Sequence, residues 1–352
     1  MNTTIPGSEE MSTETLTPFE SFLNRHDEDA WRGVVAALLP HVHEVDRNAV
    51  QIWFAFFPLA LLRAFQQSED PERLAVALQM QGRWLLRDQV DTSHTFLYGH
   101  RYWPEVRRAV VALAEAGDAS TGAALALRIR ELAAGVAAEL KVEQSLVVGI
   151  AAVACMTLQQ AGLEAFRSAP GTVHIDRKYL KKTPGQVLGE RARDDRQGLF
   201  GFLRTEDKRW TVVWDEHDDE RRFKALHLQE VASGAAEDKR PWHERDARCT
   251  VDEGPIPVQC RSASCGTCWV GVLGGAEKLT EVGTRERRKM PEMGYIDTDE
   301  ARPLIRLSCQ AQTTGALSIV IPPWNGFFGK YLKRQREAAA QGEAVQASEA
   351  SA

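Results

Sequence analysis

Residues 260–268 read CRSASCGTC, and residues 306–310 read RLSCQ. The first stretch carries three cysteines in the spacing C-x4-C-x2-C, and the second carries one. We call this set of four the cysteine quartet: Cys260, Cys265, Cys268 and Cys309. Since the chain's other two cysteines stand apart, the quartet predicts one metal or redox centre in the C-terminal part of the chain.

The quartet has the composition of an iron–sulfur site, because four thiolates are the ligand set of one [2Fe–2S] cluster. Residues between such ligands must be small enough for backbone N–H groups to approach the sulfur atoms. The intervening residues meet this need: Ser262, Ala263, Ser264, Gly266 and Thr267. Hydrogen bonds of this kind tune the reduction potential. We therefore expect the quartet to ligate one [2Fe–2S] cluster and to carry one electron at a time.

Other uses of the same cysteines explain fewer of them. Structural zinc sites usually contain paired short-spaced cysteines, and only Cys265 and Cys268 form such a pair. A Rieske centre requires two histidine ligands, yet no histidine lies between Cys260 and Cys309. A thioredoxin-like dithiol leaves Cys260 and Cys309 unused. Zinc, or plain buried or redox-active thiols, stay open as alternatives.

Residues 209–323 resemble the [2Fe–2S] domain of the plant-type ferredoxin superfamily. The resemblance lies in three segments: CRSASCGTCWVGVLGG, TRERRKM and RLSCQAQTTGALSIVIPP. It implies a β-grasp fold, in which a mixed sheet packs against a helix and the cluster loop lies at one edge. It also implies that the quartet supplies the cluster ligands.

Two features depart from the family pattern. Ala263 stands where many members have glycine, which places the local backbone geometry in question. Forty residues separate Cys268 from Cys309, more than in the compact plant proteins. The extra length predicts an inserted loop or helix around residues 284–293.

Hydrophobic patterning within residues 209–323 predicts a small sheet. Apolar residues alternate from Trp210 to Trp214, and a returning strand begins near Arg222. Further strands are predicted at residues 269–273, ending at a Gly-Gly turn, and at 317–321, ending at Pro-Pro. The pattern predicts the strands, while the β-grasp topology comes from the resemblance alone.

The rest of the chain predicts an α+β protein with an N-terminal all-α domain. Residues 18–170 carry helical apolar spacing and predict a helical bundle, after a polar and disordered N-terminus at 1–17. Residues 171–208 are a charged connector, in which 173–175 have the composition of a short strand. The segment 324–352 begins with aromatic and basic residues and ends in a disordered tail. We expect a terminal helix there, folded back on its domain or docked on a partner or membrane.

Two features of the helical domain bear on other functions. The apolar run at 52–62 contains Pro58 and is shorter than the about 20 residues that span a membrane, so we expect a core helix, with peripheral membrane contact left open. Four histidines could line a cofactor or metal pocket, or simply cap and pack helices: His41, His43, His94 and His100.

Composition and missing motifs narrow the function further. The net charge of −6 gives no electrostatic case for nucleic acid, and the polar N-terminus has no secretory signal, so we expect a reducing cytoplasm. The chain carries neither a dinucleotide fingerprint nor a P-loop. We expect an electron carrier between a low-potential donor protein and an acceptor protein, rather than a stand-alone enzyme. The alternatives are a redox-active subunit whose helical domain binds a cofactor or substrate, and a redox-sensing interaction module.

Overall fold

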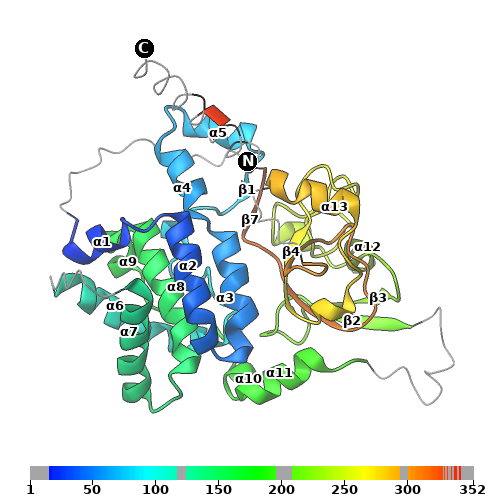
Figure 1. Cartoon of the computed structure of the whole chain (residues 1–352). Coiled ribbons are helices and arrows are strands. Elements are labelled where there is room, and N and C mark those ends of the chain that lie inside the picture. The colour runs from blue at the N-terminus through cyan, green and yellow to red at the C-terminus, as the bar shows by residue number, and fades with distance from the viewer. Residues whose placement is uncertain are drawn as a thin grey trace. The chain divides into compact units, whose positions relative to one another are not determined.

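The structure of the protein, a computed structural model, describes residues 16–116, 124–195, 208–293 and 300–327, and positions 329, 331, 334, 337, 338 and 341. The chain divides into two compact units, both drawn in Figure 1. The helical unit comprises Met1–Val76 and Leu85–Leu180, and the sheet unit comprises Ala77–Trp84 and Lys181–Ala352. N-terminal helices followed by a sheet make the described chain α+β, as the sequence predicts.

One buried helix lies at the centre of the helical unit. The α-helices of this part of the chain are α1 (Pro18–Leu23), α2 (Glu28–Leu38), α3 (Glu44–Phe56), α4 (Leu59–Gln66), α5 (Pro71–Ala77), α6 (Trp103–Glu115), α7 (Leu125–Leu140), α8 (Ser145–Ala161), α9 (Leu163–Ser168) and α10 (Arg177–Leu180). In α8 every residue from Leu146 to Leu158 is buried, as expected for a helix that is apolar on all sides. It packs against α1, α2, α3, α6, α7 and α9 (Figure 1).

The beginning of the helical unit is set by a capping box. The Thr17 hydroxyl accepts the N–H of Glu20 at 3.2 Å, and the Glu20 carboxylate accepts the N–H of Thr17 at 2.9 Å. This pair satisfies two N–H groups at the start of α1. Of the predicted disordered N-terminus, residues 1–17, the structure describes only Leu16 and Thr17.

One stretch of helix, Glu44–Gln66, is long and apolar enough to cross a membrane by length and composition alone. It contains the apolar run at 52–62, and the helix is interrupted before Pro58, which separates α3 from α4. Of the 18 most apolar consecutive residues in this stretch, 50% are buried inside the protein. Ile52 and Phe56 are fully buried, the position that the sequence predicts for a core helix.

The four histidines suggested as pocket residues fall into two groups. His94 and His100 are fully buried and lie 2.9 Å apart between their Nδ1 atoms, so they pack inside the unit. His41 and His43 instead line an open cavity of about 470 Å³ beside Arg130. His43 also caps α3. His41 and His43 therefore border a cavity that could take a small molecule.

Burial of His94 makes the helical unit sensitive to acid. Burial lowers the pKa of His94 to about 3, while its Nε2 lies 3.1 Å from the Val90 carbonyl oxygen. The unfolded chain takes up a proton at this histidine below about pH 6.5, and the folded chain excludes it, so stability falls as the pH drops. Between pH 6.5 and pH 5 we expect a loss of about 2 kcal/mol from this group.

Urea unfolding of the helical signal at the two pH values checks this expectation. The variant His94→Gln should lose much less stability between them, because glutamine does not titrate. The matched variant His41→Gln changes an exposed histidine and should retain the wild-type drop. An equal drop in all three proteins would assign the acid sensitivity to other groups.

The sheet unit contains a five-stranded mixed sheet. Its strands are β2 (Arg209–Val213), β3 (Arg222–Leu226), β4 (Trp269–Gly274), β5 (Ile305–Leu307) and β6 (Leu317–Val320), in the order β3-β2-β6-β4-β5. β2 runs parallel to β6, whereas β2 with β3, β4 with β5 and β4 with β6 are antiparallel pairs. Helix α12 (Val231–Ala236) contacts β3, and α13 (Thr284–Lys289) occupies the insertion predicted at 284–293.

The segment predicted as a connector, 171–208, is partly helical. Residues 173–175 form no strand, because the preceding N–H groups of Gly171 and Thr172 bond to the Asp91 carboxylate rather than to a neighbouring strand. Helix α10 follows, and then α11 (Pro184–Ala192). Residues 196–207 lie outside the described residues.

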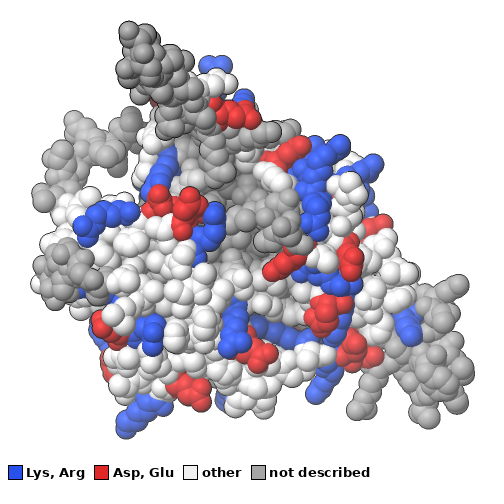
Figure 2. Space-filling model, viewed as in Figure 1, with Lys and Arg blue, Asp and Glu red and all other residues white. Residues whose placement is uncertain are grey.

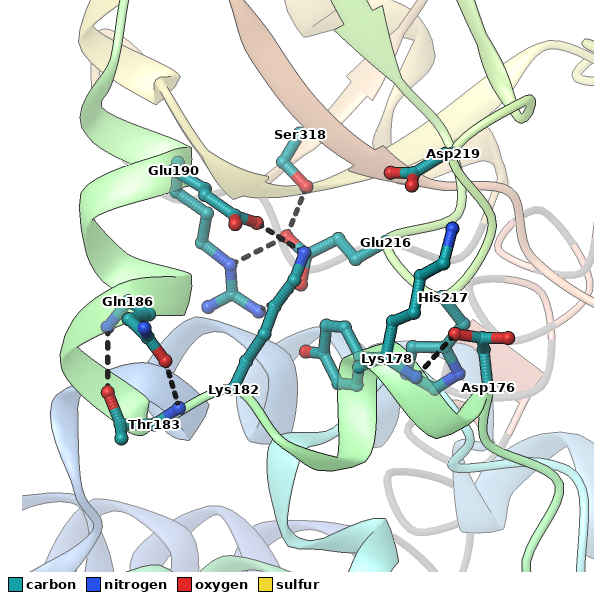
Figure 3. A network of polar contacts seen from close by, with 12 residues as sticks. Asp176, Lys178, Lys182, Thr183, Gln186, Glu190, Glu216, His217, Asp219 and Ser318 are labelled. Carbon is teal, nitrogen blue, oxygen red and sulfur yellow. Dashed lines mark hydrogen bonds and ion pairs between the residues drawn. The ribbon is translucent and has the colours of Figure 1, made fainter.

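A buried ion pair fixes α11 to the sheet. Arg191 Nε lies 2.7 Å from Glu216 Oε1, with side-chain exposures of 6% and 11%. Ser318 of β6 donates its hydroxyl to the same carboxylate at 2.5 Å, a contact drawn in Figure 3. The Arg191 side chain packs closely on Gly274, at the end of β4. This helix is therefore part of the sheet unit.

A second, two-stranded sheet was not predicted. β1 (Gln81–Gly82) pairs antiparallel with β7 (Trp324–Asn325). Trp324, predicted to begin an aromatic helical segment, is instead a buried strand residue. Beyond residue 327, the predicted segment 324–352 lies outside the described residues except at the scattered positions given above.

Candidate metal centre

Strand pairing brings the lone cysteine of the quartet to the other three. Cys268 directly precedes β4 and Cys309 lies just after β5, and these two strands pair with Trp269 opposite Leu307. Both the N–H and the hydroxyl of Ser308 donate to the Cys268 carbonyl oxygen, at 3.0 and 2.7 Å. Pairing of β4 with β5 thus holds Cys309 beside Cys268, the last cysteine of the CRSASCGTC stretch.

The first sulfur of the quartet collects several hydrogen bonds. Cys260 Sγ accepts the N–H groups of Ser262, Ser264 and Cys265 at 3.3, 3.2 and 3.3 Å. Burial raises the pKa of Cys260, but hydrogen bonds from Ser264 and Ser262 outweigh burial and lower it to about 6. Convergent N–H groups of this kind form anion-binding hollows, which also occur at iron–sulfur sites.

The other sulfurs interact with one another. A hydrogen bond from Cys268 lowers the pKa of Cys309 to about 7, and the same contact together with burial raises the pKa of Cys268. Electrostatic interactions also link Cys268 with Cys265 and Cys309 with Cys260. Cys268 and Cys309 are therefore in direct contact, and the lowered pKa values of Cys260 and Cys309 favour thiolates, the form that binds metal.

The loop of residues 260–268, called the ligand loop after its predicted role, has an unusual backbone. Arg261, Ala263 and Gly266 have φ angles of 53°, 58° and 65°, in the left-handed region. Only glycine adopts this region readily, so Ala263 occupies a position that favours the glycine of the family pattern. An alanine in this region of backbone space adds local strain.

Among the residues that the structure describes, no group of three or more His, Cys, Asp or Glu side chains is arranged around a single metal ion. A [2Fe–2S] cluster differs from a single ion in this respect, because its four thiolates are shared between two iron atoms.

A buried ion pair beside the quartet was missed by the sequence reasoning. Arg306 and Glu286 are 0% and 1% exposed and form two contacts of 2.9 Å. Glu286 Oε1 also accepts the N–H of Leu307 at 2.8 Å, and Arg306 donates to the Thr280 carbonyl oxygen. The pair therefore ties α13 to the strand that leads to Cys309. The signal was present in TRERRKM, where one acidic residue interrupts a basic run.

Cys155 and Cys249 stand apart from the centre. Both are buried free thiols, and burial raises their pKa values to about 12 and about 11. Their sulfurs are therefore uncharged near neutral pH, which separates them chemically from the quartet.

Comparison of the chain with protein-family models, with curated proteins and with solved structures returned no match. The case for the centre therefore rests on the residues of this chain.

Proposed function

We propose that this protein is a one-electron carrier in which the cysteine quartet holds a [2Fe–2S] cluster. The observation that carries the proposal is that the Cys260 sulfur accepts three backbone N–H groups, while strand pairing brings Cys309 into contact with Cys268 of the same loop. Bound there, the cluster would supply reversible one-electron transfer without bond making at the protein.

We further propose that the sheet unit has the β-grasp fold. The mixed order β3-β2-β6-β4-β5, with a parallel central pair and α12 against β3, supports this assignment. The ligand loop adjoins β4 and the edge strand β5, which agrees with the cluster position that the family resemblance implies.

The chain's own residues would tune the centre. N–H groups that donate to Cys260, and Gln310 Nε2 at 3.5 Å from Cys309 Sγ, stabilise negative charge on sulfur. Cys268 and Cys309 are buried, whereas Cys260 and Cys265 are partly exposed. Electrons would therefore pass most directly through the side of the loop that carries Cys260 and Cys265.

Donor and acceptor proteins would dock with little help from charge steering. Residues 251–323 contain nine acidic and eight basic side chains, a nearly neutral balance. Figure 2 shows acidic and basic side chains interspersed on the visible face rather than separated by sign. We propose a reducing cytoplasm as the setting, consistent with two buried free thiols outside the quartet.

Low-temperature EPR of anaerobically purified protein tests the proposed function, with iron and zinc measured in the same sample. We expect no signal from the oxidised protein, a rhombic S = 1/2 signal after dithionite, and about two irons per chain. The midpoint potential should be about −400 mV. Zinc at one atom per chain, without a signal, would make the centre structural instead.

A further inference from the structure

The β1–β7 ribbon is formed by two segments that are far apart in the sequence. Gln81 pairs with Asn325 and Gly82 with Trp324. The N–H of Phe327 donates to the Leu78 carbonyl oxygen at 2.7 Å, which extends the pairing beyond the two strands. The chain thus leaves the helical unit at residues 77–84, contributes one strand to the sheet unit, and returns.

The ribbon contacts the loop that carries Cys265 and Cys268. Asn325 is 1% exposed, and its Nδ2 donates to the Thr267 carbonyl oxygen at 3.1 Å. The Phe327 ring lies over Gly266, where an added Cβ would come within 3.1 Å of the ring. Since Gly266 also has a φ of 65°, both its backbone and its lack of a side chain suit this contact.

Asn325 is held in this contact at some cost. Its Oδ1 atom is buried and has no hydrogen-bond partner among the described residues. A buried acceptor without a partner is unfavourable. A flip of the Asn325 amide would place its Oδ1 against the Thr267 carbonyl oxygen, and two acceptors repel each other. The hydrogen bond to Thr267 therefore fixes the orientation of the amide. Such a cost marks a residue whose position matters.

We infer that the ribbon is a cover for the ligand loop, in which Asn325 and Phe327 are positioning residues. They hold residues 265–268 in the ligand conformation and keep water and chelators from the cluster side of the loop. This inference rests on the proposed function. It goes further by assigning a role to residues 77–84 and 324–327, which lie outside the region of family resemblance.

The variants Phe327→Ala and Phe327→Leu test the cover in the full-length protein. Phe223→Ala is the matched control, because Phe223 is an aromatic residue of the sheet unit, 6% exposed, on the opposite edge strand β3. After anaerobic reconstitution, the decay of visible absorbance in excess EDTA measures cluster loss. We expect about tenfold faster loss in Phe327→Ala, a smaller change in Phe327→Leu, and the wild-type rate in Phe223→Ala.

A second measurement needs no cluster. In the metal-free proteins, alkylation of Cys268 should be faster in Phe327→Ala than in wild type, while buried Cys155 reacts equally slowly in both. If the wild-type protein takes up no iron, the proposed function is wrong, and the alkylation rates alone then test whether the ribbon covers the loop. Unchanged alkylation, or equally fast cluster loss in Phe327→Ala and Phe223→Ala, would overturn the cover even if wild type binds two irons.

Discussion

Serine in place of any member of the quartet is expected to abolish the two-iron cluster. In the proposed cluster each thiolate is one of four protein ligands, and a serine hydroxyl is a much weaker ligand for iron at neutral pH. Iron per chain should fall from about two to near zero, and the EPR signal of the reduced protein should disappear. The four variants are Cys260→Ser, Cys265→Ser, Cys268→Ser and Cys309→Ser.

The chain contains its own control for this experiment. Cys249→Ser changes a cysteine that is 8% exposed and whose sulfur contacts the Pro255 carbonyl oxygen rather than the quartet. It should retain the wild-type iron content and EPR signal. Retention of two irons in any quartet variant would remove that cysteine from the ligand set, and equal loss in Cys249→Ser would point to general unfolding.

The variant Glu286→Gln is expected to destabilise the sheet unit by about 3–5 kcal/mol, because it leaves the Arg306 guanidinium charged and buried without its counter-ion. The carboxylate lost is the one that binds both Arg306 and the N–H of Leu307. Denaturant unfolding measures the loss. Since Leu307 leads to Cys309, the variant should also take up the cluster less completely.

Two comparisons separate burial from charge in this prediction. Glu281→Gln removes the charge from an exposed ion pair with Arg302, in which the two atoms lie 3.4 Å apart and the Glu281 and Arg302 side chains are 65% and 40% exposed. This variant should lose less than about 1 kcal/mol of stability. The double variant Glu286→Leu with Arg306→Met removes both charges and should recover much of the lost stability. Similar costs for Glu281→Gln and Glu286→Gln would mean that the buried pair has no special role.

Local patterns carried most of the sheet prediction. The alternation beginning at Trp210, the apolar run after Cys268 and the final strand before Pro322 correspond to β2, β4 and β6. Spacing grouped Cys260, Cys265 and Cys268, because they are close in sequence, whereas Cys309 was added from a separate segment, RLSCQ. β5 was missed since its three residues include the buried Arg306, which no hydrophobic pattern marks as interior.

Contacts between distant segments could not be predicted from the sequence. Neither the partner of Glu286 nor the pairing of Gln81 with Asn325 can be inferred from either residue alone, because both depend on how strands and helices are registered in three dimensions. The sequence by itself singled out the four cysteines as a candidate metal site and predicted the helical first part of the chain and the strands β2, β3, β4 and β6. Only the tertiary structure decided which side chains meet, since burial and hydrogen bonding are properties of the packed chain and not of its local pattern.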